Sequence, residues 1–178
     1  MRLITLFLIC LPNLLWAHDW SALREPDAIA IVRHALTPGG GDPSNHTIDD
    51  CTTQRNLSDA GRDQARHVGA ALRAENIQFD GVFTSQWCRT RETATLLNLG
   101  TPSDLPALNS FFENRIQRGP QTADLRRFLE TNTGPLMLVT HQVNISVLTG
   151  SSTRSGEIIV FRMTDAGTEI LGRILIEP

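Results

Sequence analysis

Short apolar runs alternate with amphipathic segments along this chain. Apolar runs occupy residues 28–32, 81–83 and 136–139, and each is short and rich in aliphatic side chains. Such runs are typical of buried strands. Between and after them, apolar side chains recur at helical spacing over residues 58–72, 88–97 and 125–129, which predicts a helix in each segment. Strands that alternate with helices favour a parallel sheet with helices packed against it.

The C-terminal part of the chain has a different pattern. Residues 144–148 are expected to form a short helix that ends at Gly150. Two further strands, 157–163 and 168–176, flank the turn sequence Asp165-Ala166-Gly167, which predicts an antiparallel hairpin added to the sheet. We therefore expect an α/β fold with three α/β/α layers, a mostly parallel central sheet and a C-terminal antiparallel hairpin.

Each of the three apolar runs ends at residues suited to binding phosphate. The first leads into Arg33 and His34, the second leads through Ser85 to Arg89, and the third ends at His141. In open α/β sheets the ligand crevice lies at the carboxyl ends of the parallel strands, so these side chains are expected to converge there. Two arginines and two histidines at one place predict a site for a phosphoryl group.

Three motifs carry a resemblance to a known family. Residues 33–35 read Arg-His-Ala, residues 85–94 read Ser-Gln-Trp-Cys-Arg-Thr-Arg-Glu-Thr-Ala, and residues 139–141 read Val-Thr-His. In this order, each after an apolar run, they resemble the histidine phosphatase superfamily, which includes the cofactor-dependent phosphoglycerate mutases. The resemblance implies a phosphoglycerate mutase-like fold and transfer of a phosphoryl group to a histidine.

The resemblance also implies a role for each motif residue. His34 would be the nucleophile, because imidazole is largely unprotonated near neutral pH and becomes phosphorylated in this family. The phosphate oxygens would be held by Arg33, Arg89 and His141, and Thr37 falls where relatives often carry a hydroxyl residue. Without the other motifs, Arg33 and His34 would read as an ordinary strand end and His141 as a core histidine. No metal and no cofactor is expected.

A general acid is needed to protonate the departing alkoxide. In the branch of the family closest to this chain, the acid follows the arginine motif and precedes the second histidine, and Glu113 fits that place. The alternative is that Glu113 is a surface carboxylate paired with Arg115. Asp104 and Asp42 are the second choices for the acid.

The first 17 residues have the pattern of a secretory signal peptide. Arg2 is followed by a short apolar stretch and then by Ala17, a small residue suited to cleavage. A retained membrane anchor or a buried helix is the alternative. Cleavage would leave residues 18–178 as a single domain in an exported, periplasmic protein without stable membrane insertion, and loss of Arg2 would change the formal charge from −3 to −4. Nucleic acid is not an expected partner of so acidic a chain, and the oligomeric state cannot be read from these features.

Export changes the interpretation of the two cysteines that remain, Cys51 and Cys88. An oxidising compartment favours a disulfide between them, the alternative being two unpaired buried thiols. Neither cysteine is expected to be a nucleophile, because Leu57 and Ala94 occupy the positions where the Cys-x5-Arg motif of thiol phosphatases would place its arginine.

Together these features predict a metal-independent phosphomonoesterase. The chain is similar to short exported members of the family, the lipopolysaccharide core heptose phosphatases, which implies a phosphorylated glycan or small molecule of the envelope as substrate. One alternative is a phosphatase that acts on phosphohistidine or another phosphoprotein. Another is a module that binds phosphate without turnover.

Overall fold

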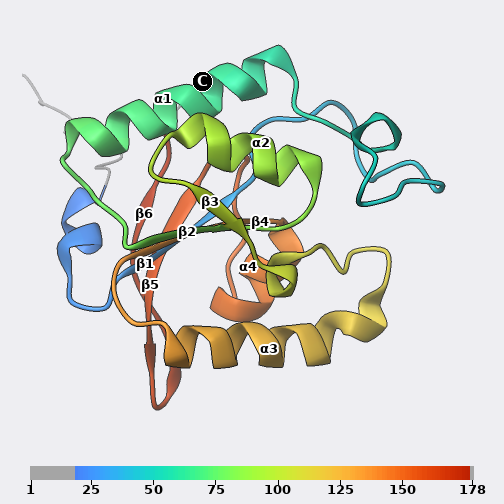
Figure 1. Ribbon diagram of the computed structural model, residues 1–178. Helices are drawn as coiled ribbons and strands as arrows, with labels where there is room; N and C mark the ends of the chain where they lie inside the picture. The colour runs from blue at the N-terminus through green and yellow to red at the C-terminus, as the bar shows by residue number, and fades with distance from the viewer. Residues whose placement is uncertain (1–18, 177–178) are drawn as a thin grey trace, which may run out of the picture.

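The computed structural model describes residues 19–176, which contain one six-stranded sheet (Figure 1). The expected signal peptide, residues 1–17, lies outside the described residues. The strand order is β3-β2-β4-β1-β5-β6. The strands are β1 (Ile29–Arg33), β2 (Gly81–Thr84), β3 (Pro102–Asp104), β4 (Leu136–Thr140), β5 (Ile158–Thr164) and β6 (Gly167–Ile174).

The sheet is mostly parallel, as the sequence predicts. Strand β1 pairs in parallel with β4, β4 with β2, and β2 with β3. Strand β5 runs antiparallel to β1 and continues through a hairpin into β6. The edge strand β3 was not expected from the sequence; it has three residues, begins with a proline, and has no apolar pattern. The three strands that precede the predicted site all end at the same edge of the sheet.

Helices cover both faces of the sheet and complete the three predicted layers (Figure 1). Helices α1 (Asp59–Ala74) and α2 (Cys88–Leu97) cover one face, and helices α3 (Arg118–Thr131) and α4 (Gln142–Thr149) cover the other. Strand β1 is buried on both sides: Ala30 and Val32 pack toward α1 and α2, whereas Ile29 and Ile31 pack toward α3 and α4. This double burial explains why the run is apolar throughout rather than alternating.

Local signals fix where the helices begin and end. The hydroxyl of Ser58 accepts a hydrogen bond from the Gly61 amide at 3.1 Å and caps α1. Gly61 also permits close packing, because a Cβ there would lie 2.0 Å from the Leu36 carbonyl oxygen. Gly150 ends α4 with φ of 70°. Within residues 19–176, four short 3-10 helices complete the elements: η1 (Trp20–Arg24), η2 (Cys51–Thr53), η3 (Pro106–Leu108) and η4 (Arg115–Gln117).

Two long loops leave the sheet at the carboxyl edge of the parallel strands. Residues 34–58 connect β1 to α1, and residues 105–117 connect β3 to α3; both lie on the right in Figure 1. A disulfide joins Cys51 in the first loop to Cys88 at the start of α2. None of the helices between residues 19 and 176 has the length and apolar character needed to cross a bilayer.

Candidate active site

His34 is held rigidly at the end of β1. Its amide donates to the Thr140 carbonyl oxygen at 2.9 Å, which extends the pairing of β1 with β4 by one residue. The Nδ1 of His34 lies 2.8 Å from the carbonyl oxygen of Ala35. Because a carbonyl only accepts, this contact places the ring hydrogen on Nδ1 and leaves the lone pair on Nε2. The orientation is the one that a nucleophilic imidazole requires.

The surroundings of His34 keep its ring uncharged. The side chain is buried, and burial followed by the positive charge of Arg89 lowers its pKa to about 3, although the hydrogen bond to Ala35 acts in the opposite direction. The charges of Arg33 and Arg55 make smaller contributions to the same lowering of the pKa. The lone pair on Nε2 is therefore available throughout the neutral and mildly acidic range.

His141 meets His34 across the end of the sheet. The two ring centroids lie 5.5 Å apart, with an angle of 65° between the ring planes. The Nδ1 of His141 accepts a hydrogen bond from Nη2 of Arg89 at 3.4 Å, so its own hydrogen is on Nε2, which donates to the hydroxyl of Ser85 at 2.8 Å. Burial, and then the charge of Arg89, lowers the pKa of His141 well below its usual value.

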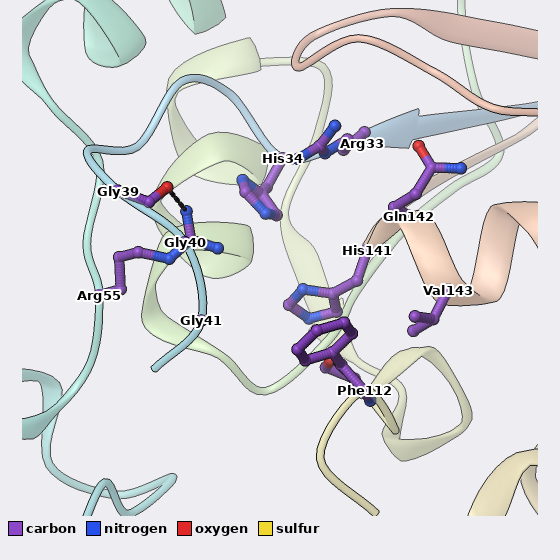
Figure 2. Close-up of a pocket in the computed structure, with 11 residues that line it drawn as sticks. Arg33, His34, Gly39, Gly40, Gly41, Arg55, Phe112, His141, Gln142 and Val143 are labelled. Atoms are coloured by element: carbon purple, nitrogen blue, oxygen red, sulfur yellow. Dashed lines mark hydrogen bonds between the residues drawn. The ribbon is translucent and has the colours of Figure 1, made fainter. Parts of the chain in front are cut away.

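Both histidines open onto one pocket of about 320 Å³ (Figure 2). The glycine segment 39–41 and Arg55 form one wall, and Phe112 stands on the other side, below His141 in this view. The pocket is lined by Arg33, His34, Gly39, Gly40, Gly41, Arg55, Ser110, Phe112, His141, Gln142 and Val143.

Arg55 is a site residue that the sequence analysis missed. Its Nη1 donates to the Thr37 hydroxyl and, at 3.4 Å, to the Gly39 carbonyl oxygen, and these contacts hold the guanidinium at the pocket wall. The only sequence signal was a lone cation between the glycine-rich loop and the start of α1. Thr37, expected to touch phosphate, is not among the residues that line the pocket; its hydroxyl positions Arg55 instead.

The arginines have unsatisfied donors. The Nε atoms of Arg33, Arg55 and Arg89 are buried and have no hydrogen-bond partner among the described residues. Arg33 donates through Nη1 to the Thr153 carbonyl oxygen at 3.1 Å, and burial followed by the charge of Arg55 lowers its pKa. Because buried donors are normally paired, this cluster of cations is suited to an anion with several oxygens.

Arg89 is brought close to the histidines, but it is already paired with a carboxylate. Its Nη1 and Nη2 donate to the two carboxylate oxygens of Asp42 at 2.8 and 3.0 Å, and both side chains are buried. Arg89 contacts His141 and is not among the residues that line the pocket. Three arginines and one aspartate leave two positive charges in excess beside two neutral histidines.

The candidate acids lie in different settings. The side chain of Glu113 is 45% exposed, and its carboxylate lies 3.6 Å from Nδ1 of His46. The alternative pairing with Arg115 is not present; the Arg115 guanidinium stacks on the Phe112 ring instead.

The other two candidates, Asp104 and Asp42, are each bound to an arginine. Asp104 is bound by Arg91 at 2.6 Å, and this hydrogen bond lowers the pKa of Asp104. Burial raises the pKa of Asp42, but hydrogen bonds from Arg89, Arg55 and Trp87 outweigh it and lower the pKa overall. Asp42 and Asp104 are both held as anions.

Comparisons with known proteins identify the family of the chain. The sequence model of the histidine phosphatase superfamily, branch 1, matches residues 29–116, which contain the His34 and Arg89 motifs. The chain belongs to the histidine phosphatase superfamily. His141 lies beyond the matched segment. A search of curated protein sequences found no match.

Solved structures of this class share the fold. A phosphoglycerate mutase from Thermus thermophilus aligns with a TM-score of 0.60 at 18% sequence identity, covering 84% of this chain and 99% of the mutase. The protein histidine phosphatase SixA, complexed with tungstate, aligns with a TM-score of 0.56 at 16% identity, covering 83% of this chain and 96% of SixA. At these identities the likeness establishes the fold alone.

Proposed function

We propose that this protein is a metal-independent phosphomonoesterase that works through a phosphohistidine on His34. The observation that carries the proposal is the uncharged His34, with its lone pair on Nε2, beside a cluster of arginines with unsatisfied donors. A nucleophile that needs no deprotonation and a preformed set of cations are the two requirements for phosphoryl transfer through nitrogen.

In the first step, Nε2 of His34 attacks phosphorus and the bond from phosphorus to the leaving-group oxygen breaks. Arg33 and Arg55 bind the nonbridging oxygens at the pocket wall, where charge develops. His141 lines the same pocket and completes the site opposite His34. In the second step water attacks phosphorus, the bond from phosphorus to nitrogen breaks, and phosphate leaves.

Glu113 is our proposal for the acid that protonates the leaving group. It follows Phe112, which lines the pocket. Burial lowers the pKa of Arg89, and the negative charge of Glu113 is close enough to that guanidinium to oppose part of this effect. To act, its carboxylate must turn from His46 toward the pocket mouth. Asp42 and Asp104 are poor alternatives, because each is bound to an arginine and has a lowered pKa.

For the substrate we propose a phosphorylated glycan or small molecule of the cell envelope, on the basis of the resemblance to exported family members. We propose correspondingly that residues 18–178 are exported as a single domain after loss of the signal peptide, and the disulfide between Cys51 and Cys88 supports an oxidising compartment. A phosphohistidine protein is the second candidate substrate, favoured by the structural likeness to SixA.

The direct test is hydrolysis of an aryl phosphate in the presence of EDTA. We expect turnover by the wild type, loss of turnover in His34→Ala, and full turnover in His67→Ala, in which an exposed histidine of α1 is removed. Turnover that persists in His34→Ala would refute the phosphohistidine. Tight phosphate binding by the wild type without turnover would instead identify a non-catalytic binding module.

A further inference from the structure

Asp42 is the most completely satisfied carboxylate near the pocket. Its Oδ1 accepts from Nη1 of Arg89 at 2.8 Å and from the amide of Arg55 at 3.0 Å. Its Oδ2 accepts from Nη2 of Arg89 at 3.0 Å and from Nε1 of Trp87 at 3.2 Å. The side chain is 7% exposed, so these four hydrogen bonds replace nearly all of its hydration.

Two of the side chains that bind Asp42 also contact the ring of His141. Nη2 of Arg89 lies between the carboxylate and the ring, and donates to Nδ1 of His141 at 3.4 Å. The indole of Trp87 meets the same ring nearly edge to face, with centroids 5.4 Å apart and an angle of 75° between the planes. One carboxylate thus reaches His141 through two independent side chains.

The opposite side of the ring depends on the same segment of chain. Nε2 of His141 donates to the hydroxyl of Ser85 at 2.8 Å, and that oxygen also accepts from the amide of Trp87 at 3.2 Å. The hydrogen stays on Nε2 only while Nδ1 has a donor opposite it. Arg89 is that donor, and its guanidinium is held by two hydrogen bonds to Asp42 and by a longer one, at 3.4 Å, to the Arg55 carbonyl oxygen.

We propose that Asp42 is a positioning residue that fixes the orientation and the tautomer of His141 through Arg89 and Trp87. The importance of Asp42 for turnover rests on the proposed phosphatase function, whereas its effect on the His141 ring does not depend on that function. Without the carboxylate, Arg89 becomes a buried cation with no anion to hold it, in a site that already contains Arg33 and Arg55. Charge repulsion then favours movement of Arg89 away from Nδ1.

The alternative role for Asp42 is to block an anion site. A carboxylate on Arg89 occupies donors that a phosphate would otherwise use, so Asp42 could instead occlude an anion site. Removal of an occluding carboxylate would strengthen the binding of a phosphate analogue and raise turnover. Removal of a positioning carboxylate would weaken both.

Asp42→Asn separates these roles, because asparagine keeps the shape of the side chain but has no charge and only one acceptor oxygen. Asp50→Asn is the matched control, since Asp50 lies in the same loop and is exposed, and its carboxylate accepts hydrogen bonds from Thr52, which does not line the pocket. Trp87→Phe keeps an aromatic ring, although a smaller one, and removes the Nε1 donor. It provides a milder perturbation if Asp42→Asn does not fold.

The first readout is the Nε2 proton of His141 in imidazole-detected NMR, with binding of tungstate as a phosphate analogue measured on the same samples. We expect the resonance to shift or vanish in Asp42→Asn, to shift less in Trp87→Phe, and to stay unchanged in Asp50→Asn. Tungstate affinity should fall about 10- to 100-fold in Asp42→Asn, by analogy with the loss seen when the outer partners of metal-binding histidines are removed, and Asp42→Glu should recover part of it.

An unchanged His141 resonance in folded Asp42→Asn, or tighter tungstate binding, would overturn the proposal. Neither readout requires turnover, so a wild type that hydrolyses no phosphate ester would refute the proposed function alone. If the wild type is active, kcat should fall in Asp42→Asn by more than KM rises. If Asp42 had a purely structural role, Asp42→Asn would lower the melting temperature but would leave kcat and KM unchanged at temperatures where the variant is folded.

Discussion

The imidazole rings of His34 and His141 lie with their centroids 5.5 Å apart, although one follows β1 and the other follows β4. Parallel pairing of these two strands, with Arg33 opposite Thr140 in the register, brings both histidines to the same edge. Burial and the neighbouring guanidinium groups lower the pKa of both rings. Two neutral histidines beside three arginines form a site whose chemistry depends on an anion.

Acid should destabilise the protein through these histidines. Folded His34 stays neutral down to a pKa of about 3, whereas an unfolded histidine takes up a proton near pH 6.5. The unfolded state therefore binds more protons between these values, and the free energy of unfolding falls as the pH is lowered through that window. We expect the melting temperature to fall from pH 7 to pH 4, and to fall less steeply in His34→Asn. Equal slopes in the two proteins would contradict the buried, neutral state of His34.

Arg55 should contribute directly to anion binding. Arg55→Ala removes a guanidinium from the pocket wall, and a hydrogen bond to a charged group contributes about 1.5–3 kcal/mol, so tungstate affinity is expected to fall about 10- to 100-fold. Arg55→Lys should retain part of the affinity, because it keeps the charge but not the planar set of donors. The control is Arg66→Ala, an exposed arginine of α1 paired with Asp63. Equal affinities in the Arg55 and Arg66 variants would exclude Arg55 from the site.

The disulfide should stabilise the loop that carries Asp42 and Arg55. It closes a span of 37 residues, and on the chain-entropy model such a closure contributes about 4 kcal/mol to the free energy of unfolding. The double variant Cys51→Ser/Cys88→Ser is expected to unfold at a lower urea concentration than the oxidised wild type. Reduced wild type should match the variant. A urea midpoint that is insensitive to both changes would show that the bond contributes nothing.

The proposed role of Glu113 as the general acid can be tested with substrates that differ in their leaving group. A general acid matters for a poor leaving group such as an alkyl alcohol and matters little for a nitrophenolate, which departs without a proton. We expect Glu113→Gln to lower kcat on an alkyl phosphate by about 10²-fold or more and to leave aryl phosphate hydrolysis nearly unchanged. Equal losses on both substrates would indicate that Glu113 acts through His46 and the loop, not as the acid.

The sequence predicted the parts of the fold that have a strong hydrophobic period. The buried strands β1, β2 and β4 and the helices α1 and α2 fall within a residue or two of the expected positions, because their apolar side chains face a core. Strand β3 escaped prediction because backbone pairing with β2, and not an apolar pattern, defines it. Convergence of His34 and His141 followed from strand direction alone.

The site residues in the loop after β1 could not be placed from the sequence. Arg55 reaches the pocket wall, and Asp42 pairs with Arg89, only because the loop folds back over α2 and is joined to it by the disulfide. Nothing in the local sequence specifies that path. The Glu113 carboxylate illustrates the same limit: motif order suggested its role, but its contact with His46 depends on how two long loops meet.

The central claim is that His34 accepts the phosphoryl group, and trapping this intermediate tests it most directly. The protein is mixed with an aryl phosphate, quenched in alkali within the first turnovers, and digested for mass spectrometry. We predict one phosphoryl group on the peptide that contains His34, stable in base, lost in acid, and absent from His34→Asn. Turnover without any phosphoryl group on His34, or with the group on another residue, would contradict the account.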